Sequence, residues 1–400
     1  MNQIKTQDPT QTLSRRQAIA TTGKALAAAA TVGGLKAWAL PELLPNETLV
    51  PFLDMPRTAP NRLDWETLNE WITPADQVFN VQHYGIPEID PETFELEITG
   101  LVRRPMKLKM SDLSARAQRE IHMTLECSGN GSSKGFMNAV YNGLYRGADL
   151  GDLLKECGVL PDAREIVFFG ADEKEETLRK GTRRELKVTV PFGRSMSIKA
   201  VQETKPLLCQ HRNGTPLELR NGAPLRLIVP GWYGVANVKW LTRIDVRADR
   251  YMGRYMARDY VTVRGEQQGN EVVYVESSVS KLRLKSIVAR VHRRPTENGR
   301  VPLRAMGAAW GDGTEITGVE VKVDDGPWRL AALDPRPYAK FSWRFFSIDL
   351  GNLAPGKHTI VSRAIDANGR VQPSADDDEI ALKRTYWEAN QQWPREIELS

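Results

Sequence analysis

The segment LECSGNG, residues 125–131, places a single cysteine, Cys127, directly before a loop that two glycines interrupt. The preceding residues, His122–Leu125, predict a short strand that delivers Cys127 to a sheet edge. Gly129 and Gly131 allow the backbone to turn sharply and to approach a bulky group closely. A thiolate is a soft ligand that suits a transition metal, and a lone cysteine requires further ligands from elsewhere. The alternative interpretation is a small, buried apolar side chain.

This loop resembles that of the sulfite oxidase family of molybdenum enzymes, in which the cysteine of a Cys-small-Gly-Asn sequence ties the metal to the protein. Because a pterin dithiolene supplies the other sulfurs in that family, the resemblance implies a Mo-molybdopterin cofactor with Cys127 as metal ligand and catalytic residue. It also implies an α+β fold. A molybdopterin-binding catalytic domain is expected over residues 40–280, and an immunoglobulin-like β-sandwich dimerisation domain over residues 281–400.

A second stretch, residues 73–85, resembles the family's first cofactor-contacting segment. In the family, a Thr-Pro pair precedes an aromatic residue, a polar residue and a histidine that touch the pterin, which implies contacts from Asn80, His83 and Tyr84. A histidine held by structural hydrogen bonds is the alternative. Sulfite-oxidising members usually carry an arginine beside this histidine to hold the substrate anion, whereas this chain has Val81-Gln82.

The segment NGAPLRLIVPGWYGVANVKWL, residues 221–241, has the features of an anion cradle. A strand over Leu225–Val229 leads into a Pro-Gly break, and a glycine-containing loop then exposes backbone amides between two cationic side chains. Phosphates are bound in this way, by oriented amides and charge-assisted hydrogen bonds. In the family the matching positions bind the pterin and its phosphate. The resemblance therefore implicates Asn221, Arg226, Asn237, Val238 and Lys239.

Three further residues are candidates for the site. Asp172 follows a strand predicted over Ile166–Gly170 and is a candidate cofactor contact. Arg258-Asp259-Tyr260 resembles a family sequence whose tyrosine hydrogen-bonds at the metal's reactive oxygen, so Tyr260 is a candidate catalytic residue; a core tyrosine is the alternative. Family members also place an arginine near the chain end that reaches the substrate pocket, and Arg384 is the nearer match.

The N-terminus predicts an export signal. Two arginines in Ser14–Ala20 precede an alanine-rich run over Ala25–Val32 and a small-x-small cleavage site at Ala37–Ala39, which together are typical of a twin-arginine signal peptide over residues 1–39. A solvated basic arm is the alternative. The apolar run is too short and too weakly hydrophobic for a stable membrane span. We therefore expect passage through the twin-arginine translocase and a soluble protein in the periplasm.

Composition agrees with a two-domain enzyme. The 400 residues, 41% of them hydrophobic, suffice for two packed cores. The net charge of +5 is mild, and its acids and bases are interspersed, which argues against a nucleic-acid surface. Three widely spaced cysteines (Cys127, Cys157 and Cys209) are not a disulfide framework, although one pair can in principle bridge. No Cys-x-x-Cys-His occurs, so any haem is expected on a partner.

The remaining patterns predict individual elements. Helices are expected at residues 64–71 and 150–158, a strand at residues 94–100, and a solvated loop over the charged run at residues 172–187. From about Lys281, short alternating strands separated by turns predict the immunoglobulin-like sandwich. These strands are expected at residues 286–291, 304–310, 319–323, 341–350 and 359–365.

The resemblance implies an oxidoreductase whose molybdenum centre exchanges an oxygen atom and two electrons with a small anionic sulfur substrate. Oxidation of sulfite to sulfate is the default, with electrons passed to a separate c-type cytochrome by a homodimeric enzyme. After the cysteine loop, where the family often has arginines, this chain has Gly131-Ser132-Ser133-Lys134. Because the expected anion-holding arginines are absent there and at Val81-Gln82, a sulfane-sulfur dehydrogenase and a sulfoxide reductase remain alternatives. A catalytically silent binding subunit is the third.

Overall fold

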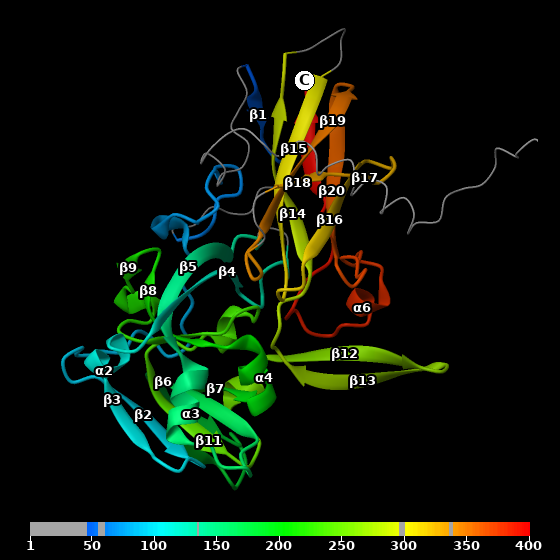
Figure 1. Ribbon diagram of the computed structural model, residues 1–400. Helices are drawn as coiled ribbons and strands as arrows, with labels where there is room; N and C mark the ends of the chain where they lie inside the picture. The colour runs from blue at the N-terminus through cyan, green and yellow to red at the C-terminus, as the bar shows by residue number, and fades with distance from the viewer. Residues whose placement is uncertain (1–45, 55–60, 134–135, 296–300, 336–338) are drawn as a thin grey trace, which may run out of the picture. The chain divides into compact units, whose positions relative to one another are not determined.

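Strand β4 (Gln118–Glu126) ends immediately before Cys127 and forms the edge of a sheet ordered β10-β8-β5-β4 (Figure 1). It contains the short strand predicted over His122–Leu125. The computed structural model describes residues 46–54, 61–133, 136–295, 301–335 and 339–400. The predicted signal peptide and Lys134 lie outside these residues. The other members of this sheet are β5 (Val140–Asp149), β8 (Leu207–Arg212), β9 (Thr215–Pro216) and β10 (Arg226–Ile228).

A second sheet, ordered β3-β2-β11-β6-β7, packs with the first around a shared apolar core. Its strands are β2 (Glu95–Gly100), β3 (Met106–Lys109), β6 (Glu165–Leu178), β7 (Leu186–Ser197) and β11 (Leu241–Arg247). The short helical segments of this region are η1 (Ala75–Gln77), α2 (Met110–Ser114), α3 (Leu150–Cys157), α4 (Ile198–Thr204), η2 (Leu219–Asn221), η3 (Gly234–Ala236) and α5 (Arg254–Ala257).

Helix α3 begins and ends where the sequence predicted. The Asp149 carboxylate accepts a hydrogen bond from the Gly151 amide at 2.7 Å, which caps the first turn. Gly158 ends the helix in the left-handed region with φ 68°, which glycine adopts without a Cβ clash. Buried Leu150, Leu153 and Leu154 attach the helix to the core of the two sheets.

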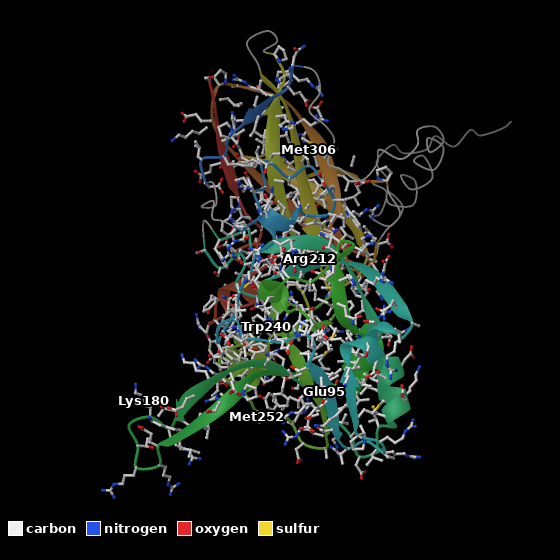
Figure 2. All side chains as sticks on the ribbon, turned by 90° about the vertical axis from the view of Figure 1, so that its left-hand side faces the viewer. Glu95, Lys180, Arg212, Trp240, Met252 and Met306 are labelled. Carbon is white, nitrogen blue, oxygen red and sulfur yellow. The ribbon has the colours of Figure 1, made fainter. Side chains whose placement is uncertain are left out.

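Two β-hairpins were not anticipated. The charged run at residues 172–187, predicted as a loop, instead extends β6 and β7 into a hairpin with Glu173–Leu178 paired to Leu186–Pro191. Figure 2 shows Lys180 at the outer end of this hairpin. The prediction was wrong because cross-strand pairing sustains the extended backbone although most of its side chains are solvated. The second hairpin consists of β12 (Val261–Gln268) and β13 (Glu271–Ser278).

The C-terminal region is a sandwich of two antiparallel sheets, ordered β1-β14-β15-β19-β18 and β17-β16-β20-β21, which confirms the predicted α+β fold with an immunoglobulin-like β-sandwich. Strand β1 lies near the N-terminus, yet it pairs with β14 in this region. The elements are β1 (Thr48–Val50), β14 (Lys285–Arg293), β15 (Val301–Trp310), β16 (Ile316–Val323), β17 (Arg329–Leu330), β18 (Ala332–Leu333), β19 (Arg344–Leu353), β20 (Gly356–Asp366), α6 (Asp378–Ala381) and β21 (Arg395–Leu399).

The helix predicted at residues 64–71 is wrong, because the segment has a turn over residues 65–67 and no helical residue. Its tryptophans pack between the two regions of the chain, where Trp65 stacks on Trp310 with ring centroids 5.9 Å apart. The indoles of Trp71 and Trp343 each donate to the other residue's backbone carbonyl, at 3.2 and 3.0 Å. These tertiary contacts override the local helical pattern.

Two further findings concern membrane-spanning helices and the pairing of the cysteines. No helix within the described ranges is long and apolar enough to cross a membrane. Cys127, Cys157 and Cys209 are all unpaired, so the open question of a bridge between two of them is answered in the negative for this structure. Cys157 and Cys209 are both buried.

Candidate functional site

Most of the predicted site residues line a single cavity. They arrive from separate parts of the chain and meet beside the end of β4. The predicted residues in its wall are Asn80, His83, Cys127, Asp172, Asn221, Arg226, Asn237, Lys239 and Tyr260. Apolar side chains, among them Phe79, Leu125 and Phe192, complete the lining.

The Cys127 loop is a tight turn with hydrogen bonds between nearby backbone groups. The Cys127 amide donates to the Ala139 carbonyl at 2.9 Å, and the Cys127 carbonyl accepts from the Asn130 amide at 2.9 Å. Gly131 has φ 90°, so a larger residue there is strained. Burial raises the pKa of the Cys127 thiol, and a hydrogen bond from the Gly129 amide partly offsets this. A metal bound at this sulfur therefore has to displace a proton.

The anion cradle is rigid because its own side chains bind its backbone. Arg226 donates from Nε to the Asn237 carbonyl and from Nη1 to the Asn221 carbonyl, both at 3.2 Å. Asn237 Oδ1 accepts from the Val229 amide at 2.8 Å, and its Nδ2 donates to the Tyr233 carbonyl at 3.0 Å. Asn237 thus fixes the loop backbone through Val229 and Tyr233, while Arg226 presents its charge to the cavity.

Lys239 and Asp172 provide opposite charges in the cavity wall. The Lys239 ammonium donates to Asn80 Oδ1 at 2.9 Å, and burial together with Arg226 lowers its pKa to about 7. Asp172 is 5% exposed, and its Oδ1 has no hydrogen-bond partner among the described residues. Burial raises the pKa of Asp172 to about 6. A buried polar atom without a partner is costly, so the wall is suited to a polar ligand that hydrogen-bonds here.

His83 and Tyr260 form a hydrogen-bonded pair on the same cavity. His83 Nε2 and the Tyr260 hydroxyl lie 2.7 Å apart, and the imidazole stacks on Phe192. Burial and the charge of Lys239 lower the pKa of His83 to about 4. Burial and the nearby Cys127 raise the pKa of Tyr260. Both groups are therefore neutral near pH 7, and the phenol keeps a proton that it can offer in a hydrogen bond.

Three predicted residues do not line the cavity. The Tyr84 hydroxyl instead donates to the Glu176 carboxylate, and the side chain of Val238 is buried in the apolar core. Arg384 is exposed, and its Nε donates to the Tyr274 hydroxyl at 2.9 Å. The Arg384 amide donates to the Val263 carbonyl and the side chain lies on the β12–β13 hairpin, so its role near the substrate stays a prediction.

The sequence reasoning missed three residues around the site. Ser128 lines the cavity with a buried Oγ that has no hydrogen-bond partner among the described residues, and its place beside Cys127 was a usable signal. Phe192 stacks on His83, and Trp387 stacks on Tyr260 with ring centroids 4.3 Å apart. No local pattern distinguishes these two from ordinary core aromatics.

Comparisons with known proteins agree with this arrangement. Residues 83–255 match the family model for an oxidoreductase molybdopterin binding domain, and residues 276–387 match that for a Mo-co oxidoreductase dimerisation domain. Mitochondrial sulfite oxidase from Homo sapiens is 30% identical over 331 residues, which are 77% of this chain and 58% of that protein. NAD(P)H nitrate reductase from Hordeum vulgare is 30% identical over 340 residues, covering 76% of this chain and 37% of the reductase.

A solved structure resembles the fold over almost the whole chain. The sulfane dehydrogenase SoxCD from Paracoccus pantotrophus superposes with a TM-score of 0.69 at 23% sequence identity, over 93% of this chain and 96% of that chain. The residues in the cavity fit a molybdopterin, because a thiol suited to the metal, two cations suited to a phosphate and a partnerless carboxyl oxygen share one wall. The chain belongs to the sulfite oxidase family of molybdopterin-dependent oxidoreductases.

Proposed function

We propose that this protein oxidises sulfite to sulfate at the cavity beside Cys127. The observation that carries the proposal is that the Cys127 thiol shares one cavity wall with Arg226, Lys239 and Tyr260. The human relative is named for sulfite and the barley relative for nitrate, and both substrates are small oxyanions. The matched segment is only 58% of the human protein, so the substrate is carried over as part of the proposal.

Each residue of the wall has a defined task in this proposal. The bound cofactor supplies oxygen-atom transfer and the exchange of two electrons. Cys127 holds the metal through its sulfur, while Arg226 and Lys239 bind the pterin phosphate. Tyr260 would offer its hydroxyl proton to a group bound beside Cys127, which requires His83 Nε2 to donate to the phenol oxygen. Phe79, Leu125 and Phe192 contribute apolar surface to the lining, which disfavours water beside them.

A second candidate substrate, a sulfane sulfur, is favoured by one feature of the wall. Among the described residues that line the cavity, Arg226 is the one guanidinium, and it already binds two backbone carbonyls. At residues 81 and 82 the lining has Val81 and Gln82, which carry no charge to hold an oxyanion. A less charged sulfur substrate, or a sulfoxide reduced in the opposite direction, needs no such arginine.

The proposal extends to the setting of the enzyme. The dimerisation-domain match at residues 276–387 supports a homodimer. The predicted twin-arginine signal supports export to the periplasm. The electrons are expected to leave singly to a separate c-type cytochrome. Fractionation of cells that express the full chain tests export, with the signal arginines Arg15 and Arg16 both changed to lysine as the control; the variant should stay in the cytoplasm.

The substrate is tested by a sulfite titration of molybdenum-loaded protein, with cytochrome c or ferricyanide as acceptor and metal content measured on the same sample. Rapid reduction of the acceptor is expected for the native protein and for Cys157→Ala, and none for Cys127→Ser. Cys157 is the control because it is likewise an unpaired cysteine, but lies outside the cavity wall. Full molybdenum loading without sulfite oxidation would reject sulfite and favour the sulfane or sulfoxide substrate.

A further inference from the structure

The C-terminal sandwich and the segment that follows it hold the cysteine loop from behind. Three carbonyls of the loop accept hydrogen bonds from residues beyond position 284. The Ser128 carbonyl accepts from the Glu388 amide at 2.8 Å, and the Asn130 carbonyl accepts from Lys285 Nζ at 2.9 Å. The Gly131 carbonyl accepts from Gln391 Nε2 at 2.8 Å. The loop that carries the metal ligand is therefore seated on a different part of the chain from the cradle.

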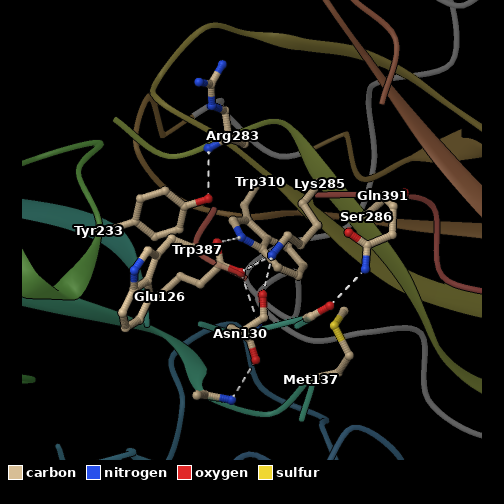
Figure 3. Close-up of polar contacts among 12 residues, drawn as sticks. Glu126, Asn130, Met137, Tyr233, Arg283, Lys285, Ser286, Trp310, Trp387 and Gln391 are labelled. Carbon is tan, nitrogen blue, oxygen red and sulfur yellow. Dashed lines mark hydrogen bonds and ion pairs between the residues drawn. The ribbon is translucent and has the colours of Figure 1, made fainter. Parts of the chain in front are cut away.

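The centre of this seat is a fully buried ion pair (Figure 3). Lys285 Nζ lies 2.5 Å from Glu126 Oε1, and both residues have 0% exposure. Glu126 immediately precedes Cys127, and its carboxylate also accepts from Asn130 Nδ2 at 2.9 Å and from the Trp310 indole at 2.8 Å. The Asn130 contact joins the two ends of the Cys127 turn, and the Lys285 and Trp310 contacts attach that turn to β14 and β15.

A second chain of hydrogen bonds ties the same strand to the loop. Ser286, the residue after Lys285, donates from its amide to Gln372 Oε1 at 2.8 Å. Gln372 Nε2 donates to the Gln391 carbonyl at 3.1 Å, and Gln391 in turn reaches Gly131. Two neighbouring residues at the start of β14 therefore support both sides of the loop.

We propose that Lys285 is a positioning residue for Cys127, through which the dimerisation domain sets the place of the metal-binding sulfur. The Lys285 ammonium contacts the carboxylate of Glu126, the residue before the cysteine. It also donates to the carbonyl of Asn130, in the turn after the cysteine. A displacement of β14 relative to the cysteine loop is transmitted to the Cys127 backbone, because these buried groups have no water to replace a broken contact. The inference rests on the proposed function only in taking Cys127 as the metal ligand.

The test compares the holoenzyme with the variants Lys285→Gln, Glu126→Gln and the double variant. Each single change leaves one buried charge without its partner, whereas two glutamine amides can bind each other. We expect each single variant to retain molybdenum about tenfold less firmly, the low end of the effect known for groups that orient metal ligands. The paramagnetic resonance spectrum of the one-electron-reduced metal should broaden in each single variant. The double variant should recover most of both properties.

Two further variants keep the result interpretable. Lys281→Gln removes a lysine from the same segment that is 54% exposed and should leave the spectrum unchanged. Gln391→Leu removes the bond to Gly131 without leaving a buried charge, and decides the matter if Lys285→Gln does not fold; its spectrum should also broaden. A wild-type spectrum and wild-type molybdenum content in folded Lys285→Gln, or failing that in Gln391→Leu, would overturn the proposal.

Cys127→Ser is measured alongside to separate this proposal from the assignment of the site. If Cys127→Ser has the wild-type spectrum, Cys127 is not the ligand and the proposed function loses its basis. If Cys127→Ser changes the spectrum and the Lys285 and Gln391 variants do not, the site stands and the positioning role of Lys285 is rejected.

Discussion

The two walls of the cavity differ in where their support comes from. In the cradle, Arg226 binds carbonyls 5 and 11 residues away, and Asn237 binds an amide 8 residues away. In the cysteine loop, Glu126 binds partners 159 and 184 residues away, and Gly131 binds one 260 residues away. The backbone of the cradle is held mainly by Arg226 and Asn237 from its own segment, although Lys239 also reaches Asn80. The cysteine loop takes its shape when the C-terminal region packs against it.

This difference has a physical consequence for how the two walls respond to change. A locally bonded loop keeps most of its contacts whenever its own segment is folded. A loop seated on a distant buried ion pair depends on two regions being packed correctly, and leaving one charge unpaired is costly in the apolar interior. Mutations in the two walls should therefore differ both in size and in how far their effects spread.

The largest effect is expected from breaking the Lys285–Glu126 ion pair that supports the cysteine loop. Lys285→Met leaves the Glu126 carboxylate buried without its cation, and we expect a loss of about 3–5 kcal/mol in the free energy of unfolding. Glu126→Gln combined with Lys285→Met should recover most of that loss. Urea unfolding of the cofactor-free proteins measures both. Additive losses in the double variant would show that the two side chains do not act as a pair.

The pH dependence of the cradle side is governed in part by Asp172. Its folded-state pKa of about 6 lies above the ordinary value of 3.8, so the folded state favours the protonated carboxyl. That stabilisation is complete below pH 3.8 and is lost as the pH rises through about 6. As the pH rises from about 4 to about 7, the free energy of unfolding of cofactor-free Asp172→Asn should increase relative to that of the native protein, by about 3 kcal/mol in total. An unchanged difference across this range would contradict the burial assigned to Asp172.

Breaking a hydrogen bond within the cradle should lower the stability less than breaking the Lys285–Glu126 ion pair. Asn237→Ala leaves the buried Val229 amide without its acceptor, for which we expect about 2 kcal/mol of lost stability. The damage should stay within the cradle, so that hydrogen exchange rises at residues 229–238 and not at the Cys127 loop. Increased exchange in both walls would show that the cradle is not independent of the loop.

The smallest effect is expected at Arg384. This guanidinium is exposed on the β12–β13 hairpin and contributes little there. Arg384→Ala should change stability by less than about 0.5 kcal/mol and leave the apparent KM for sulfite unaltered. Steady-state kinetics at several sulfite concentrations measure this. A large rise in KM would indicate that Arg384 contacts the substrate.

The predictions that succeeded were those with local causes. The strand that ends at Cys127, helix α3 with its Gly158 terminus and the short strands of the sandwich follow from periodicity and turn residues. The family resemblance supplied the candidate residues, most of which line one cavity. The strand before Cys127 and helix α3 carry their signals within short segments, whereas the cavity gathers its residues from separate parts of the chain.

The failures have distant causes. Residues 64–71 form no helix, because Trp65 and Trp71 make their contacts with Met137 and Trp343 in other parts of the chain. Nothing near Lys285 in the sequence indicates that its ammonium is buried against Glu126.

The most direct test of the central claim is molybdenum X-ray absorption spectroscopy of the purified native protein, Cys127→Ser and Cys157→Ala. If Cys127 holds the metal in this cavity, Cys127→Ser shows one sulfur ligand fewer than the native protein, and Cys157→Ala shows the native number. An equal number of sulfur ligands in the native protein and in Cys127→Ser would contradict the assignment of Cys127 as the metal ligand.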